Sequence, residues 1–172
     1  MNRIKKGLSI REITVFAMLG ALMFVGDIAF EWAMNVHPVT MLLMLYTVVY
    51  GKKGIIPFFI YILLEVCFFP GFWIVPYLYI FPIYWLCTLA LPKKGSLVMR
   101  QACYSIACTM FGLLFGTLYA PFAVLMFSRG TTLFAYILSG LGADAVHAAG
   151  NFAMSFLIIP LSSVLAKAEK QR

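Results

Sequence analysis

The chain has 172 residues, of which 63% are hydrophobic and only 11% are charged. Because soluble domains carry about 25% charged residues, this composition excludes an ordinary soluble protein and predicts one embedded in a membrane. The net charge of +7 would suggest nucleic-acid binding in a soluble chain, but here the basic residues mark membrane topology, and we exclude nucleic acid as a partner.

All but one of the Lys and Arg residues fall in four clusters, and Arg129 stands apart. Consecutive clusters are separated by roughly 40 residues or more, enough for two helices of about 20 residues that cross the bilayer and return. The clusters are Arg3/Lys5/Lys6/Arg11, Lys52/Lys53, Lys93/Lys94/Arg100 and Lys167/Lys170/Arg172. Under the positive-inside rule they are cytoplasmic and Arg129 is external. We therefore predict an all-α, polytopic membrane protein with six transmembrane helices and both termini in the cytoplasm.

The predicted spans cover residues 12–33, 37–50, 54–69, 74–91, 101–127 and 135–164, within one integral membrane domain over residues 1–172. The basic N-terminus is similar to a signal peptide, but Asp27 and Glu31 interrupt the apolar run and no small-residue cleavage site follows. The second and third spans are short for a hydrocarbon core about 30 Å thick, so we expect them to be half-embedded or surrounded by protein. Pro121 and Pro160 lie deep enough in the last two spans to kink them.

Small residues recur at four-residue spacing in two spans. The first span carries Ala17-x-x-x-Ala21, with Gly20 adjacent, and the fifth carries Gly112-x-x-x-Gly116. This pattern lets another helix approach closely. The alanine pair lies in the predicted inner half of its span, within reach of a partner on the cytoplasmic side.

Four of the six acidic residues fall at or near the outer halves of predicted spans: Asp27, Glu31, Glu65 and Asp144. An ionisable side chain in hydrocarbon costs at least ~2.5 kcal/mol, so it normally faces protein or water and often marks a pathway. Asp27 and Glu31 could instead flank a loop at the level of the lipid head groups. Glu65 is harder to explain in that way, since it lies about 16 Å of helix rise beyond Gly54. Together they suggest a polar chamber that opens outward.

Asp144, His147 and Asn151 stand at positions i, i+3 and i+7 of the last span, which places them on one helix face. A metal site would need a second His or a further carboxylate, and a catalytic Asp–His pair would need a Ser or Cys nucleophile. The three residues could form a hydrogen-bond network between helices or could contact a ligand, and the two roles can coexist.

Aromatic residues crowd the same predicted outer level: Phe30, Trp32, Phe68, Phe69, Phe72, Trp73, Tyr77 and Tyr79. They suit an interfacial belt, but aromatic rings beside buried carboxylates and amides also suit a pocket for a flat heterocycle. The four cysteines show no CxxC spacing, so we expect packing residues and neither a disulfide nor a metal site.

The chain resembles the S component, the substrate-binding membrane subunit, of an energy-coupling factor (ECF) vitamin transporter. The resemblance covers essentially the whole length. It rests on six predicted spans in 172 residues, on the alanine pair, and on Asp144, His147, Gly150 and Asn151 in the helix that contains Pro160. The run Asn35–Val36–His37 and the turn Gly51–Lys52–Lys53 are also similar to that family.

The resemblance implies that the chain binds a vitamin or related heterocyclic micronutrient outside and delivers it inward with a transmembrane coupling subunit and two ATP-binding subunits. It implies docking of that coupling subunit at Ala17 and Ala21, and a lid near residues 31–37. The implied substrate-binding residues are Asp27, Glu31, His37, Glu65, Trp73, Tyr77, Asp144, His147 and Asn151. No GxxxxGK[ST] sequence occurs, so we expect ATP hydrolysis on the partner subunits, no enzymatic activity and no cofactor in this chain.

The predicted chamber has no basic residue apart from Arg129, so a strongly anionic ligand would lack a counter-charge. A neutral or cationic heterocycle fits better, and pyrimidine, pyridoxine-type, thiamine-like, deazapurine and riboflavin compounds remain open. Two functions other than substrate binding remain open, that of a structural protein and that of a hydrolase. A structural protein of the cell-shape machinery would need no polar pocket, and an intramembrane hydrolase would usually need an HExxH-type or paired-Glu motif that the chain lacks.

Overall fold

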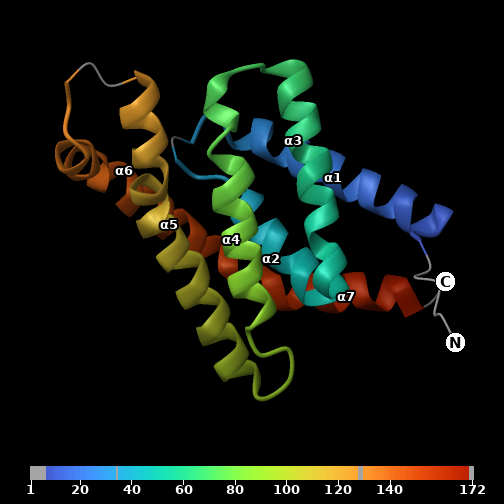
Figure 1. The fold of residues 1–172 in the computed structure, drawn as a ribbon. Helices are drawn as coiled ribbons and strands as arrows, with labels where there is room; N and C mark the ends of the chain where they lie inside the picture. The colour runs from blue at the N-terminus through green and yellow to red at the C-terminus, as the bar shows by residue number, and fades with distance from the viewer. Residues whose placement is uncertain (1–6, 34, 128–129, 171–172) are drawn as a thin grey trace, which may run out of the picture.

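The computed structural model describes residues 7–33, 35–127 and 130–170, and these ranges fold into helices without strands (Figure 1). Five stretches of this part of the chain are long and apolar enough to cross a membrane. One of them, Val39–Phe68, consists of two α-helices joined by a 3-10 turn, so six helices fit the six predicted spans. The all-α class and the membrane-type helices are thus confirmed. Arg129 and the basic residues at positions 3, 5, 6 and 172 lie outside the described residues.

The elements are α1 (Ile10–Phe30), α2 (Val39–Tyr50), η1 (Gly51–Ile55), α3 (Ile56–Phe68), η2 (Phe72–Ile74), α4 (Tyr77–Leu89), α5 (Leu97–Phe127), α6 (Leu133–Ser155) and α7 (Ile158–Lys170). Five of the predicted spans correspond to single helices, but the sixth is divided into α6 and α7. Pro160 explains the break, because it has no N–H to donate to the carbonyl of Phe156. The chain forms a turn just before Pro160, where Leu157 N–H donates to Met154 O, three residues earlier, at 3.0 Å. Pro121, by contrast, lies within a continuous α5.

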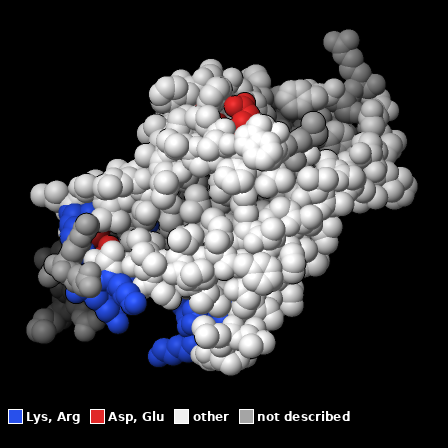
Figure 2. All heavy atoms as spheres, turned by 180° about the vertical axis from the view of Figure 1, so that it is seen from behind, with Lys and Arg blue, Asp and Glu red and all other residues white. Residues whose placement is uncertain are grey.

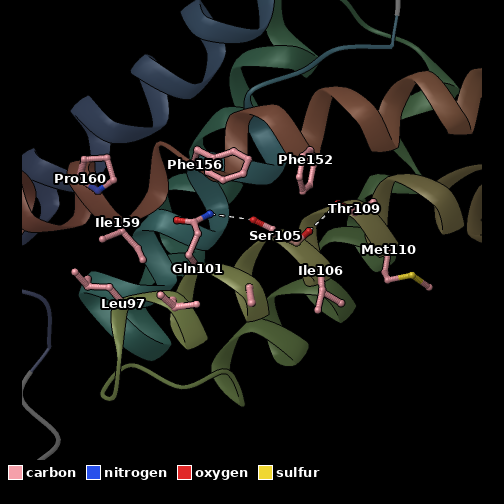
Figure 3. A pocket seen from close by; sticks show the side chains of 12 residues that line it. Leu97, Gln101, Ser105, Ile106, Thr109, Met110, Phe152, Phe156, Ile159 and Pro160 are labelled. Carbon is pink, nitrogen blue, oxygen red and sulfur yellow. Dashed lines mark hydrogen bonds between the residues drawn. The ribbon is translucent and has the colours of Figure 1, made fainter.

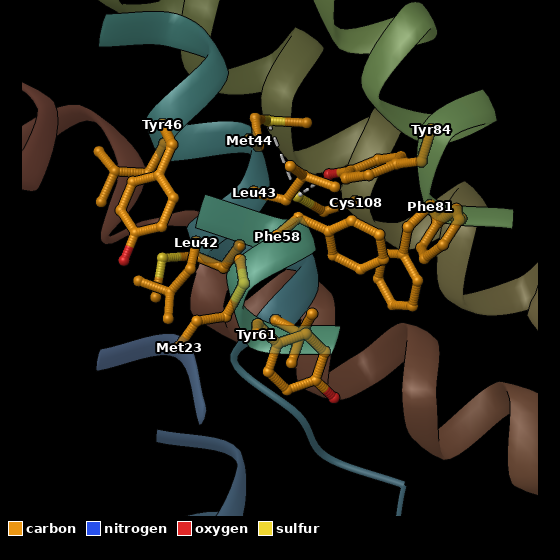
Figure 4. Close-up of a cluster of buried hydrophobic side chains, with 14 of the residues drawn as sticks. Met23, Leu42, Leu43, Met44, Tyr46, Phe58, Tyr61, Phe81, Tyr84 and Cys108 are labelled. Atoms are coloured by element: carbon orange, nitrogen blue, oxygen red, sulfur yellow. Dashed lines mark hydrogen bonds between the residues drawn. The ribbon is translucent and has the colours of Figure 1, made fainter. Parts of the chain in front are cut away.

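Helix α2 is the centre of the bundle. Its residues from Val39 to Thr47 are all buried, and a helix that is apolar and buried on every side belongs to a protein core. The expectation that a short second span is surrounded by protein is therefore confirmed. The neighbouring α3 differs, since it exposes Phe59, Leu63 and Val66 on its outer side. Figure 4 shows side chains of α2 packing with aromatic rings of α3 and α4 and with Cys108 of α5.

Glycines allow two pairs of helices to approach closely. A Cβ atom at Gly20 of α1 would lie 2.7 Å from the side chain of Ile60 of α3, and a Cβ at Gly112 of α5 would lie 2.7 Å from Cα of Ala148 of α6. The Gly112-x-x-x-Gly116 pattern therefore serves packing within the chain. Ala17 and Ala21 behave differently, because both are exposed on the surface of α1.

Ion pairs hold the two ends of the described chain together. Arg11 of α1 pairs with Glu169 of α7 at 2.9 Å, and Lys53 of η1 pairs with Glu12 of α1. In Figure 2, most Lys and Arg side chains of the visible face gather along its lower left edge, and acidic side chains stand out at the top. The basic residues therefore share one end of the bundle, as the predicted topology requires. Which side of a membrane this end faces stays a prediction.

Candidate ligand-binding site

Asp27, near the end of α1, is a point at which three segments meet. Its Oδ1 accepts a hydrogen bond from Nδ1 of His37 at 2.8 Å, and its Oδ2 accepts one from the hydroxyl of Tyr61 at 2.8 Å. His37 precedes α2 and Tyr61 lies on α3. Both carboxylate oxygens thus have partners, and hydrogen bonds to an ionised acceptor are among the stronger ones in proteins. Asp27 therefore fixes the position of the α1–α2 connection relative to α3.

Glu65 lies one helical turn after Tyr61, on the same face of α3. Only 5% of this residue is exposed. It borders a cavity of about 320 Å³ at the acidic end of the bundle, which is lined by Asp27, Ile28, Glu31, His37, Glu65, Phe69, Trp73 and Tyr77. Three carboxylates and an aromatic wall therefore surround one space.

A second cavity, of about 90 Å³, adjoins the first and shares Asp27, His37 and Tyr77 with it. Three of the residues that line it each have a buried polar atom without a hydrogen-bond partner: Thr40 Oγ1, Asp144 Oδ2 and His147 Nε2. Buried polar atoms nearly always have a partner in native proteins, whether protein or bound water. The three atoms therefore offer hydrogen-bonding positions that water or a ligand group could occupy.

Helix α6 presents Asp144 and His147 to this cavity in fixed orientations. Oδ1 of Asp144 accepts a hydrogen bond from the backbone N–H of Gly116 at 2.9 Å, which leaves Oδ2 available. The ring of His147 lies edge-on to Phe115, at 5.0 Å between centroids, and to His37, at 6.1 Å. Each side chain is thus held from one side and has an unpartnered polar atom.

A third cavity, of about 410 Å³, lies between α5 and α6 and shares Asn35, Tyr77, Phe115 and Asp144 with the second. Its polar groups are mainly neutral, from Tyr119, Tyr136 and Ser139. Tyr77 borders all three cavities. The three spaces therefore adjoin one another in a row, with carboxylates at one end, phenol rings at the other and the residues with unpartnered atoms between them.

The structure brings most of the predicted site residues to these cavities. Asp27, Glu31, His37, Glu65, Trp73, Tyr77, Asp144 and His147 line one or more of them. Asn151 does not, because it is buried farther along α6, where its Nδ2 donates to the carbonyl of Cys108 at 3.2 Å. The polar face of α6 thus has two parts, one that lines the cavities and one that ties α6 to α5.

Sequence reasoning missed several residues of the site. Tyr61 binds Asp27 directly, and its position one turn before Glu65 was the signal that could have identified it. Asn35 lines two cavities and has a φ of 59°, in the left-handed region that Asn tolerates better than most residues. Thr40 and Phe115 gave no signal, since both lie in uniformly apolar helical sequence.

Comparison with known proteins assigns no family. No family model matches the chain, and no curated protein or solved structure matches it. In the described residues, no three His, Cys, Asp or Glu side chains are grouped so that they could hold a metal ion. The chemistry of the site is therefore inferred from its lining residues, which supply hydrogen-bond acceptors, imidazole nitrogens and aromatic faces.

Proposed function

We propose that the chain is the high-affinity substrate-binding subunit of an ECF-type transporter. In this proposal it captures a vitamin or related heterocyclic micronutrient and delivers it inward with a transmembrane coupling subunit and two ATP-binding subunits. The observation that carries the proposal is the row of three cavities with unpartnered atoms of Thr40, Asp144 and His147 at its centre. Unpaired polar groups are costly in an apolar bundle, and a polar ligand would satisfy them.

The size of the cavities suits a small organic molecule. Ligand pockets typically measure about 300–1,000 Å³, and the two larger cavities, at about 320 and 410 Å³, each reach this range. A purely structural protein of the cell-shape machinery would need no polar pocket, so the carboxylates and unpartnered atoms beside these spaces favour a binding subunit.

The charges of the walls define the chemistry of the ligand. Asp27, Glu31, Glu65 and Asp144 supply carboxylates, and no described Lys or Arg lines the three cavities. A carboxylate needs a cation or a hydrogen-bond donor once it is taken out of water. Trp73, Tyr77 and Phe115 stand edge-on to one another, with centroids 5.5 and 5.8 Å apart. The proposed ligand is thus a neutral or cationic flat ring that donates hydrogen bonds.

The surface of α1 supports the proposed docking of the coupling subunit. Ala17 and Ala21 are exposed, whereas Gly20, between them, faces α3. Small residues on an exposed membrane helix permit another helix to approach closely. The alanine pair is therefore free for a contact outside the chain.

Titration of the purified protein with a panel of the candidate heterocycles, followed by calorimetry, tests the proposal. Glu65→Gln keeps the shape of the side chain and removes its charge, so a cationic ligand should lose about 1.5–3 kcal/mol, or roughly 10- to 150-fold in affinity. The matched control is Glu12→Gln, which removes a carboxylate at the opposite end of the bundle and should leave the affinity unchanged.

Co-purification from the native host provides the second measurement. The proposed subunit should bring down a membrane protein and two ATPases. The assignment of the site is wrong if folded Glu65→Gln and Asp144→Asn proteins both bind every ligand as the wild type does, because the ligand would then bind elsewhere. The proposed function is wrong if the wild-type protein binds none of the panel and recovers no ATPase.

A further inference from the structure

A wide groove in the surface of the bundle lies away from the candidate site. It measures about 820 Å³ and runs along the first half of α5, beside the junction of α6 and α7 (Figure 3). Its walls include Leu97, Ile106, Phe152 and Phe156, which are exposed on the outer surface of the bundle. In a membrane this surface faces hydrocarbon, so the groove is open to the lipid.

The few polar groups of the groove satisfy one another. Gln101 Nε2 donates to Ser105 Oγ at 2.9 Å and to the carbonyl of Ser155 at 3.3 Å, and the two serine hydroxyls lie 2.7 Å apart. The hydroxyl of Thr109 donates to the carbonyl of Ser105 at 2.7 Å. Unlike the second cavity of the candidate site, the groove has no lining residue with a fully buried, unpartnered polar side-chain atom. The occupant of the groove must be apolar, like its walls. An empty groove would lose dispersion contacts along its whole length.

The length of the groove matches one lipid leaflet. The lining residues of α5 extend from Leu97 to Met110, which corresponds to about 20 Å of helix rise. The hydrocarbon of one leaflet is about 15 Å thick, half of the ~30 Å core. A moderately tilted groove of this length can accommodate one acyl chain from the head-group level to the middle of the bilayer.

Two lysines precede, in the sequence, the end of the groove that Leu97 forms. Lys93 and Lys94 lie just before α5, and Lys94 is exposed and has no hydrogen bond or ion pair to any residue that the structure describes. Lys93 is engaged with the carbonyl of Thr47 at 3.3 Å. The N-terminus of α5 adds a partial positive charge. This end therefore complements the phosphate of a lipid head group.

We propose that the groove is a specific site for an anionic phospholipid, with one acyl chain between α5 and the α6–α7 junction and the phosphate bound at Lys94. The proposal is independent of the transport function, because it involves none of the residues of the candidate site. An anionic lipid fits this surface because its acyl chain is complementary to the apolar groove and its phosphate is complementary to the lysine.

Native mass spectrometry of the delipidated protein tests the proposal, with phosphatidylglycerol and phosphatidylcholine of identical acyl chains as probes. Wild-type protein should bind phosphatidylglycerol more tightly. Lys94→Gln should weaken this binding about fivefold, which corresponds to ~1 kcal/mol for one basic residue, and should leave phosphatidylcholine binding unchanged. The matched control is Lys52→Gln, which removes another exposed lysine that lies on η1 and should keep the preference.

A second pair of variants tests the acyl-chain part. Ala102→Trp fills the groove and should abolish tight binding of both lipids, whereas Ala149→Trp adds the same bulk on an exposed part of α6 outside the groove and should not. Phosphatidylglycerol with a photoreactive acyl chain provides a measurement on the unmodified protein, and it should label the peptides that contain Ile106 and Phe152.

Three results would overturn the proposal. Equal affinities of the two lipids for wild-type protein would remove the head-group site, and labelling confined to α1 or α3 would place the acyl chain elsewhere. Dimers in the wild-type spectrum that disappear in Ala102→Trp would show that the occupant is a second copy of this chain.

Discussion

Gly112→Ala is the substitution that most directly tests how α5 and α6 build the candidate site. An added Cβ atom would lie 2.7 Å from both the N and Cα of Ala148, and these atoms would have to move to at least 3.4 Å to restore ordinary contact. Because they belong to the backbone, no side-chain rotation can relieve the clash. The two helices must separate, and the contacts of Asp144 with Gly116 and of His147 with Phe115 lie next to this point.

The magnitude follows from two opposing effects. Overpacking of a close contact costs about 1–3 kcal/mol, while alanine is favoured over glycine in a helix by up to ~1 kcal/mol. Gly112→Ala should therefore lower the free energy of unfolding by up to about 2 kcal/mol. Gly142→Ala in α6 is the matched control, because Gly142 lines none of the three cavities and an added Cβ would meet no neighbouring segment within 4 Å. It should leave stability unchanged or raise it slightly.

Unfolding of both variants in detergent micelles, followed by tryptophan fluorescence as a denaturing detergent is added, measures the difference. Ligand affinity measured on the same samples should fall for Gly112→Ala and stay constant for Gly142→Ala. If both proteins unfold at the same point, the close approach of α5 and α6 does not limit stability and the reasoning from the glycine contact is refuted.

Three further predictions concern the two ends of the bundle and the surface of α1. Ala17→Trp should abolish uptake in cells but leave ligand binding to the purified protein intact, and a loss of both would show that this face of α1 supports the fold instead. In a cysteine-free background, a cysteine introduced at Lys52 should resist an impermeant thiol reagent in intact cells, whereas one at Trp32 should react. The reverse pattern would show that the predicted topology is inverted. Tyr61→Phe removes one hydrogen bond to Asp27 and should lower the free energy of unfolding by about 1–3 kcal/mol, measured by the same detergent titration. An unchanged midpoint would mean that water replaces the hydroxyl.

The acidic part of the site could be predicted from the sequence because charge in an apolar span is conspicuous. Glu65 and Asp144 stand out in helices that are otherwise apolar, and the cost of burying them requires a polar environment. The structure places both beside adjoining cavities. The short length of the second span likewise predicted its burial, because a helix too short to cross the bilayer needs protein around it.

The remaining features depend on contacts between distant segments, which helical periodicity does not specify. Asn151 shares a helix face with His147, but the local rotation and tilt of α6 turn it toward Cys108 and away from the cavities. Phe115 lies in an apolar helix in which every face is compatible with lipid or with protein. The sequence predicts only a kink where the structure has a break between α6 and α7, because Pro160 is compatible with either.

Helix α1 connects the three features on which the proposed transport function depends. Asp27 joins it to the ligand-binding end through His37 and Tyr61, and Arg11 pairs with Glu169 at the basic end. The exposed Ala17 lies between them, about 15 Å of helix rise from Asp27. A partner that docks at Ala17 therefore contacts the same rigid element that orients the carboxylate of the site. In the proposed transporter, any displacement of α1 on docking would be opposed by the hydrogen bonds of Asp27, so docking and ligand affinity should be thermodynamically linked.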